Sequence, residues 1–207
     1  MKIGILGGTG RMGTGLARGY AQAGHEVILG SRDADKAKDA AAQIGGSVRG
    51  GTLAEAAQAG EIIVLSVPFR EAANTVRALQ NALTGKIIVD ITNPFGAVPP
   101  DSSGMAENMK AAPHARWVAA YKTNFWKTLD APMLPSGVRR DILVCGDDED
   151  AKRVVMQLIE APGFRAVDCG GLSNARTLDL MVPLMIELDR RYGGNALSSW
   201  KFMEGGM

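Results

Sequence analysis

A glycine-rich segment near the N-terminus is the feature that most constrains the fold. Residues 8–13 read Gly-Thr-Gly-Arg-Met-Gly, a GxGxxG pattern that follows the apolar run 2–6 and opens the helical pattern 12–23. In that context the pattern binds the pyrophosphate of a dinucleotide. We expect Gly8 to permit the tight turn, Gly10 to let the backbone approach the phosphates, and Gly13 to let the helix pack on the strand. A plain glycine-rich turn is the alternative, since the chain has 26 glycines. The strand and helix around the pattern favour the dinucleotide site, to which we also assign Thr9, Arg11 and Met12.

The alternation of strands and helices continues along the chain. Strands are expected at 26–29, 61–67, 86–91, 117–121, 140–145 and 164–168, and helices at 33–44, 53–59, 71–83, 151–160 and 172–191, with a long loop at 98–104. Strands that are apolar throughout are buried on both faces of a parallel sheet. The chain is therefore predicted to be an α/β protein of Rossmann type, with a doubly wound, mostly parallel sheet and helices on both faces. We expect one domain over 1–207: residues 1–139 bind the dinucleotide, and 140–207 form a small α/β extension with the substrate cleft and a dimer contact.

Composition argues against several classes of partner. Charged residues make up 22% of the chain and the formal net charge is +1, so no nucleic-acid partner is indicated. Apolar stretches are far shorter than the roughly 20 residues of a membrane span. The two cysteines and two histidines show no metal-site spacing, so no metal is predicted. Because the chain runs directly into its first motif, we expect a cytoplasmic protein.

The end of the second predicted strand selects between the two nicotinamide dinucleotides. An NAD site has an acidic residue there that binds the ribose hydroxyls. This chain has Gly-Ser-Arg at 30–32 and no carboxylate before Asp33. Ser31, the guanidinium fork of Arg32 and the ammonium of Lys36 could instead bind a 2′-phosphate. The alternative is that Arg32 and Lys36 are solvated charges beside Asp33 and Asp35. We predict NADP(H) as the cofactor.

Longer segments carry a resemblance to one family. The segment 7–13, Gly-Leu-Ala at 15–17 and Gly-Ser-Arg at 30–32 resemble the NADPH-dependent coenzyme F420 reductases and their relatives. Val-Pro-Phe at 67–69, Val-Cys-Gly-Asp-Asp-Glu at 144–149 and Leu-Ser-Asn-Ala-Arg at 172–176 extend the resemblance over nearly the whole chain. It implies hydride transfer between NADPH and a second acceptor, a deazaflavin (coenzyme F420) or a flavin. It also places further cofactor contacts at the strand ends, on Ser66, Val67, Pro68 and Asn93.

Three side chains are candidates for the acceptor side of the site. Lys122 stands where this family has Asn or His, and it could orient or protonate a substrate oxygen, or pair with an acidic group. The alternative is a surface ammonium. Trp126 could stack on a flavin-like ring or belong to the core or an interface. Arg176 could reach an anionic substrate or pair with Asp179.

Two other functions stay open at this point, together with the assembly. One is an NADPH-dependent reductase of a small carbonyl or imine compound, and the other is a non-catalytic NADP(H) sensor. Residues 178–188 are apolar nearly all round and include Pro183, so this helix is either fully buried or packed against another subunit. We expect a homodimer.

Overall fold

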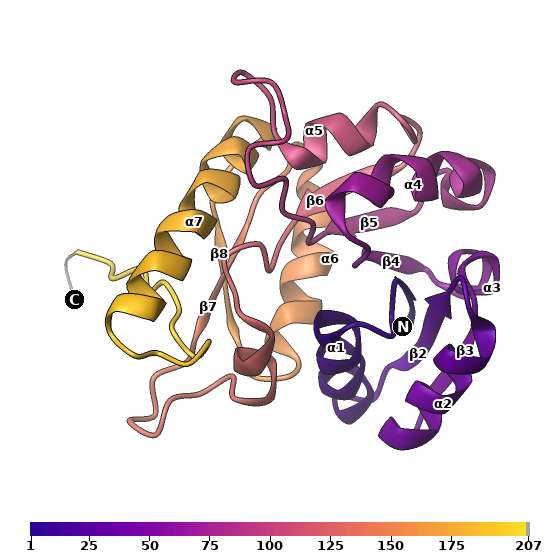
Figure 1. Cartoon of the computed structure of the whole chain (residues 1–207), viewed down its shortest axis with the longest axis horizontal. Helices are drawn as coiled ribbons and strands as arrows, with labels where there is room; N and C mark the ends of the chain where they lie inside the picture. The colour runs from indigo at the N-terminus through magenta and orange to yellow at the C-terminus, as the bar shows by residue number, and fades with distance from the viewer. Residues whose placement is uncertain (206–207) are drawn as a thin grey trace.

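The computed structural model describes residues 1–205 and contains one large parallel sheet (Figure 1). The spatial order of its six strands is β3-β2-β1-β4-β5-β6, and all neighbouring pairs are parallel. The strands are β1 (Lys2–Leu6), β2 (Glu26–Ser31), β3 (Val48–Thr52), β4 (Ile62–Leu65), β5 (Ile87–Asp90) and β6 (Arg116–Ala119). The order reverses between β1 and β4, as in a doubly wound Rossmann sheet. The predicted fold class is therefore confirmed.

Helices cover both faces of this sheet. They are α1 (Arg11–Gln22), α2 (Ala34–Ile44), α3 (Leu53–Ala59), α4 (Phe69–Leu83), α5 (Gly104–Met109), α6 (Glu149–Glu160) and α7 (Ala175–Arg191), with 3₁₀ turns η1 (Trp126–Asp130) and η2 (Leu172–Asn174). Side chains alternate along each strand, so Val64 packs in the cluster under α1, α2 and α6, and Leu65 in the cluster under α3, α4 and α7. The chain thus buries two apolar layers, one on each face of the sheet.

Two further strands form a small second sheet. The parallel strands β7 (Asp141–Val144) and β8 (Arg165–Asp168) are joined to β6 by an antiparallel bridge between Ala119 and Cys145. The Ala119 N–H donates to the Cys145 carbonyl at 2.9 Å, and the Cys145 N–H donates back at 3.1 Å. Ile142 and Val144 belong to the same apolar cluster as Val118. The predicted extension 140–207 is therefore packed on the main sheet, apart from residues 206–207, which lie outside the described residues.

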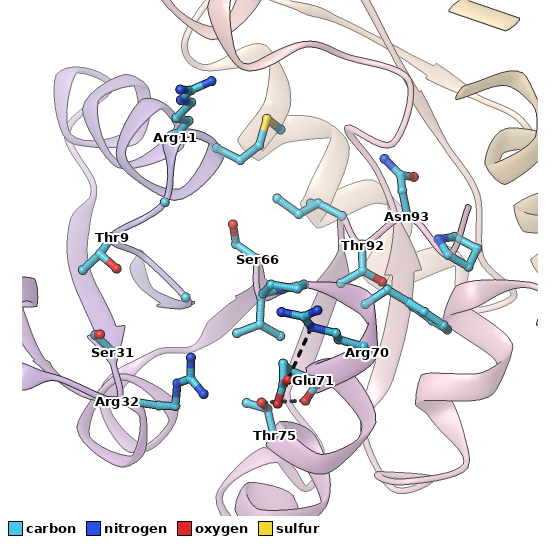
Figure 2. Close-up of a pocket in the computed structure, with 18 of the residues that line it drawn as sticks. Thr9, Arg11, Ser31, Arg32, Ser66, Arg70, Glu71, Thr75, Thr92 and Asn93 are labelled. Atoms are coloured by element: carbon cyan, nitrogen blue, oxygen red, sulfur yellow. Dashed lines mark hydrogen bonds and ion pairs between the residues drawn. The ribbon is translucent and has the colours of Figure 1, made fainter. Parts of the chain in front are cut away.

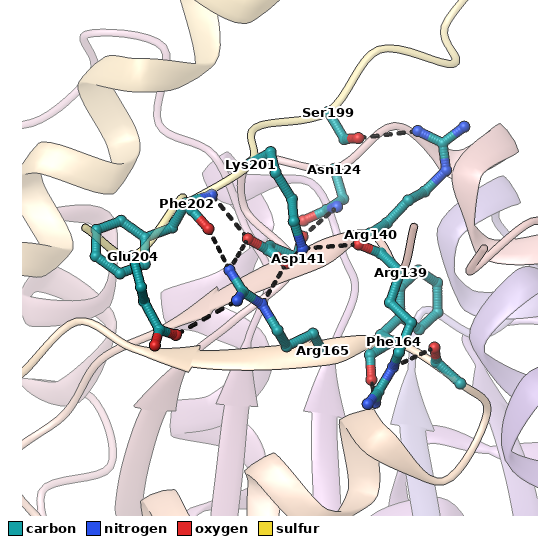
Figure 3. A network of polar contacts seen from close by, with 11 residues as sticks. Asn124, Arg139, Arg140, Asp141, Phe164, Arg165, Ser199, Lys201, Phe202 and Glu204 are labelled. Carbon is teal, nitrogen blue, oxygen red and sulfur yellow. Dashed lines mark hydrogen bonds and ion pairs between the residues drawn. The ribbon is translucent and has the colours of Figure 1, made fainter. Parts of the chain in front are cut away.

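The C-terminal segment folds back over this small sheet (Figure 3). The fully buried carboxylate of Asp141 pairs with Arg165 at 2.7 Å and with Lys201 at 2.6 Å, and it accepts a hydrogen bond from the Phe202 N–H at 2.8 Å. The Arg140 guanidinium donates to the carbonyl of Leu197 at 2.7 Å. Residues 197–202 are therefore held to this sheet by Asp141, the first residue of β7, and by Arg140, which precedes it.

One strand and one α-helix were not expected from the sequence. β3 reads Val-Arg-Gly-Gly-Thr and lacks both apolar alternation and a continuous apolar run, although it pairs with β2 along its whole length. α5 begins at Gly104, the last residue of the expected loop, and the Ser103 side chain accepts a hydrogen bond from the Ala106 N–H at 3.1 Å. The strands and helices that were predicted are present, with end points shifted by a few residues.

The last helix, α7, has one buried and one exposed side. Leu178, Val182 and Met185 are buried, whereas Leu180 and Leu184 are 58% and 51% exposed. Of the two alternatives stated for this helix, full burial is therefore wrong for this chain on its own. α7 lies at the opposite side of the molecule from α2 and β3 (Figure 1). No helix within residues 1–205, α7 included, combines the length and apolarity needed to cross a membrane.

Candidate functional site

A pocket of about 810 Å³ opens at the carboxyl ends of the central strands. Figure 2 shows Thr9, Ser31 and Arg32 on one side of it, Thr92 and Asn93 on the other, and Ser66 between them. These residues follow strands β1, β2, β4 and β5, so the pocket spans the point where the strand order reverses. Open α/β sheets bind their ligands at this point. The pocket is lined by residues 7, 9–12, 31, 32, 53, 66–71, 75, 91–95 and 97.

The glycine loop forms the floor at the end of β1. Gly7 has a φ of +85°, and a Cβ there would lie 2.8 Å from the Ser66 carbonyl oxygen. The tight turn therefore depends on Gly7 as well. Gly8 is a central residue of the turn that the Gly10 N–H closes on the Gly7 carbonyl at 3.3 Å, and a Cβ on Gly8 would lie 2.8 Å from the Leu29 side chain of β2. A Cβ on Gly13 would lie 2.7 Å from the Gly8 Cα, which fits the predicted close packing of α1. At Gly10 the nearest such atom is 3.6 Å away, so this position leaves space toward the pocket.

The first turn of α1 offers unpaired backbone donors to this space. No side chain caps the helix at Gly10, and its first turn has no acidic residue. Helix N-termini carry free N–H groups and a partial positive charge, and both favour a bound anion. Gly10, Arg11 and Met12 line the pocket at this end. The arrangement fits a pyrophosphate, the group that the GxGxxG pattern predicts here.

At the end of β2, the neutral and cationic side chains face the pocket and the acid does not. Ser31 and Arg32 line the pocket. Asp33 caps α2 instead, because its carboxylate accepts a hydrogen bond from the Lys36 N–H at 3.2 Å. The Lys36 ammonium lies 3.5 Å from Asp33, its side chain is 76% exposed, and it does not line the pocket. The local charge at this end of the pocket is therefore positive, which suits a phosphate.

At the opposite end, the segment after β5 forms the wall. Asn93 lines the pocket, and its Nδ2 donates to the Lys122 carbonyl at 3.1 Å. Its Oδ1 is buried and accepts no hydrogen bond from the described part of the chain, so this acceptor is unpaired. Ser66, Val67 and Pro68 line the middle. Thr92 and Phe95 were not predicted from the sequence. Thr92 directly follows the predicted strand 86–91, and such residues are expected at this edge, whereas Phe95 lies four residues beyond the strand end.

Comparison with known proteins decides the family. Residues 2–94 match the family described as NADP oxidoreductase, coenzyme F420-dependent. An F420-dependent NADP reductase of Methanocaldococcus jannaschii is 35% identical, with 93% of this chain and 94% of that protein covered. This chain belongs to the F420-dependent NADP oxidoreductase family. An F420-dependent NADP reductase of Methanothermobacter marburgensis is 36% identical, with 91% of this chain and 92% of that protein covered. A candidate F420-dependent NADP-reductase from Arthrobacter sp. FB24, solved as a crystal structure, has a TM-score of 0.87 at 26% identity, covering 99% of this chain and 100% of its own.

In this member of the family, Lys122 does not line the pocket. Its side chain is fully buried, so the alternative of a surface ammonium is wrong. The ammonium lies 2.8 Å from Asp179 and 4.0 Å from Asp90, and it donates to the Thr92 carbonyl at 2.5 Å. Lys122 therefore lies behind the wall that Thr92 and Asn93 present to the pocket.

The other two acceptor-side candidates also lie outside the pocket lining. Trp126 is half-buried at the start of η1, and the Arg11 guanidinium stacks 5.1 Å from its ring centroid. Trp126 is thus connected to the pocket through Arg11, which lines it. Arg176 is exposed at the start of α7. Asp179 pairs with Lys122, so the alternative in which Asp179 pairs with Arg176 is wrong.

Proposed function

We propose that this chain is an NADP(H)-dependent oxidoreductase that transfers hydride between NADPH and a deazaflavin, coenzyme F420, or a flavin. The observation that carries the cofactor is the uncapped start of α1 beside Ser31 and Arg32, with Asp33 turned away onto α2. The family of the chain supports the acceptor, since the relatives from both methanogens are named F420-dependent NADP reductases.

Each part of the pocket has a role in this proposal. The backbone of residues 9–13 binds the pyrophosphate, while Ser31 and Arg32 bind the 2′-phosphate. The Lys36 ammonium binds the same 2′-phosphate after it moves away from the Asp33 carboxylate, with which it pairs at 3.5 Å. Ser66, Val67 and Pro68 lie along the nucleotide, and the free Oδ1 of Asn93 accepts a hydrogen bond near the nicotinamide end. The bound NADPH supplies a hydride from its nicotinamide C4. The chain contributes position and exclusion of water, and one proton from solvent completes the reduction of the acceptor.

The activity is tested with purified protein and defined acceptors. NADPH is mixed with coenzyme F420, FMN or FAD, and the absorbance of both reactants is followed. We expect NADPH oxidation that requires a deazaflavin or flavin and stops when the acceptor is exhausted. Turnover of a small carbonyl or imine compound without any flavin would replace this proposal with the reductase alternative. Tight NADPH binding without turnover of any acceptor would favour the sensor.

The exposed side of α7 bears on the roles of the two parts of the chain and on its assembly. We propose that residues 1–139 bind the dinucleotide, and that 140–207 complete the acceptor cleft and pair with a second copy. Leu180 and Leu184 lie one turn apart on the exposed side of α7 and are 58% and 51% exposed, which supports an apolar contact between subunits. Light scattering is expected to give the mass of a dimer for the natural chain and of a monomer for Leu184→Glu. Ala78→Glu on the exposed side of α4 is the control, and a monomeric natural chain would refute the dimer.

A further inference from the structure

A tight turn at the rim of the pocket holds an aromatic residue in a conformation that aromatic residues rarely adopt. The Ala97 N–H donates to the Pro94 carbonyl at 3.0 Å, which closes a four-residue turn. The two central residues, Phe95 and Gly96, have φ values of +47° and +85°. Positive φ at both central positions characterises a type I′ turn, which favours Gly, Asn or Asp. Gly96 follows this preference, and Phe95 does not.

Within residues 1–205, little packing compensates for this choice. Phe95 is 65% exposed, so its ring buries little apolar surface in the folded chain. Left-handed backbone at a bulky residue is strained, and such residues cluster where a ligand needs them. Local conformation and packing would both favour Asn at position 95. The phenyl ring therefore gains a favourable contact only when another molecule binds against it.

The turn lies at the end of the pocket that faces away from the 2′-phosphate subsite. Phe95 lines the pocket together with the apolar Ile91 and Pro94 and the neutral polar Thr92 and Asn93 of the same segment. The Ser31 and Arg32 end carries a cation, whereas the segment 91–97 after β5 has no charged side chain and offers apolar ones. A dinucleotide with its phosphates at α1 and its 2′-phosphate at Ser31 brings the nicotinamide toward this end of the sheet. The hydride acceptor must meet the nicotinamide here.

We propose that Phe95 is the platform on which the planar ring of the hydride acceptor stacks. A flat heteroaromatic ring gains apolar contact and an offset-stacked geometry from a phenyl ring. The strained turn holds the phenyl ring at the mouth of the pocket before the acceptor arrives, which lowers the entropy lost on binding. This inference rests on the proposed function, because the acceptor class is taken from it. It assigns to Phe95 a contact with the acceptor and no contact with NADPH.

The test uses a substitution that the turn itself prefers. Phe95→Asn suits the first central position of a type I′ turn and removes an exposed apolar ring, so the melting temperature is expected to stay equal or rise. The Kd for NADPH is expected to stay within about twofold, while kcat/KM for coenzyme F420 falls about tenfold or more, mainly through KM. Phe95→Tyr keeps the ring and is expected to retain kcat/KM within about threefold. Met133→Asn removes another large apolar side chain, which is 52% exposed and lies outside both the pocket and residues 140–207, and serves as the control with unchanged kinetics.

The possible failures are distinguishable. Unchanged F420 kinetics in Phe95→Asn, with an active natural chain, would overturn the platform and leave the proposed function intact. Weaker NADPH binding in Phe95→Asn would place the ring on the cofactor instead, and a changed mass in light scattering would place it at a subunit contact. Either result overturns the inference. Binding of F420 to the NADP⁺-loaded natural chain is measured in parallel by fluorescence titration, and absence of both binding and turnover would overturn the proposed function and the platform together.

Discussion

The ammonium nitrogen of Lys122 lies 2.8 Å from Oδ1 of Asp179, and neither side chain is more than 6% exposed. The other oxygen of Asp179 accepts a hydrogen bond from the Gly104 N–H, the first residue of α5, at 2.7 Å. Lys122 also donates to the Thr92 carbonyl, in the wall of the pocket. One buried ion pair therefore connects the end of β6, the start of α5, helix α7 and the pocket wall. Its position indicates a structural role, in contrast to the catalytic role expected from the sequence.

Removing the Lys122 ammonium is expected to lower the free energy of unfolding. Lys122→Met leaves Asp90 and Asp179 buried without their cation, which costs about 3–5 kcal/mol in the free energy of unfolding. Asp179→Asn is expected to cost less, because Lys122 keeps Asp90 and the Thr92 carbonyl as partners. Denaturant titration of both variants measures the difference. Unchanged stability in Lys122→Met combined with turnover lowered about 10²-fold would restore the catalytic role.

Cofactor choice is expected to depend on Arg32. NADPH should bind at least about tenfold more tightly than NADH, a difference of about 1.4 kcal/mol, because only NADPH carries the 2′-phosphate that Arg32 can bind. Arg32→Ala should remove most of the difference. Arg49→Ala, an exposed arginine of β3 outside this pocket, is the matched control. Equal affinities of the natural chain for the two dinucleotides, measured by calorimetry, would contradict this assignment.

Substitution of two glycines of the glycine-rich loop should have different effects: one should lower stability and the other should lower NADPH affinity. Gly13→Ala places a Cβ 2.7 Å from the Gly8 Cα, a backbone atom that cannot move aside, and about 1–3 kcal/mol of stability should be lost. Gly10→Ala has 3.6 Å to its nearest neighbour and a φ of −79°, so the fold should tolerate it. Its methyl group occupies the approach to α1, and the NADPH affinity should fall at least about tenfold. Thermal unfolding and NADPH titration of both variants decide this, and the reverse pattern would refute it.

Acid should weaken the contact between β6 and α6. The Arg116 guanidinium, 2.6 and 2.7 Å from the Asp148 carboxylate, lowers the pKa of that carboxyl to about 2. An unfolded aspartate titrates near about 3.9. The stability from this pair is therefore present above that value and is lost as the pH falls toward 2. Unfolding free energies of the natural chain and Arg116→Met between about pH 6 and pH 2 test this. The variant should lose less stability on acidification, and identical curves would show that the pair contributes nothing.

The sheet was predictable where sequence pattern and structure follow the same physics. The apolar runs of β1, β4 and β5 are buried on both faces, so composition alone identifies them. β3 could not be predicted in this way, because the close packing of α2 against it requires small residues in this strand. A Cβ on Gly50 would lie 2.1 Å from the backbone of Ala37 in α2. Glycine disfavours strands in general, so the close approach of this helix produces a strand without the usual signal.

The site was predictable where its residues are neighbours in sequence. Residues 9–12, Ser31 and Arg32 follow strands within a short motif, and all of them line the pocket. The role of Lys122 depends on Asp179, which arrives from α7 through tertiary packing. No local pattern encodes that pairing. A lysine after a strand can therefore be buried behind a pocket or face into it, and its partner decides between the two.

The fastening of the C-terminal segment to Asp141 has a consequence for synthesis on the ribosome. Strands β1 to β6 are complete once residue 119 has been made, so the large sheet can form while translation continues. The carboxylate of Asp141 emerges well before Lys201 and Phe202, two of the groups that bind it. Before then, Asp141 has Arg165 as a partner but lacks Lys201 and the Phe202 N–H. Burial of an incompletely paired charge is unfavourable, so β7 is expected to pack less stably at that stage. The nascent chain is expected to expose the small sheet to proteases and chaperones until Phe202 has left the exit tunnel.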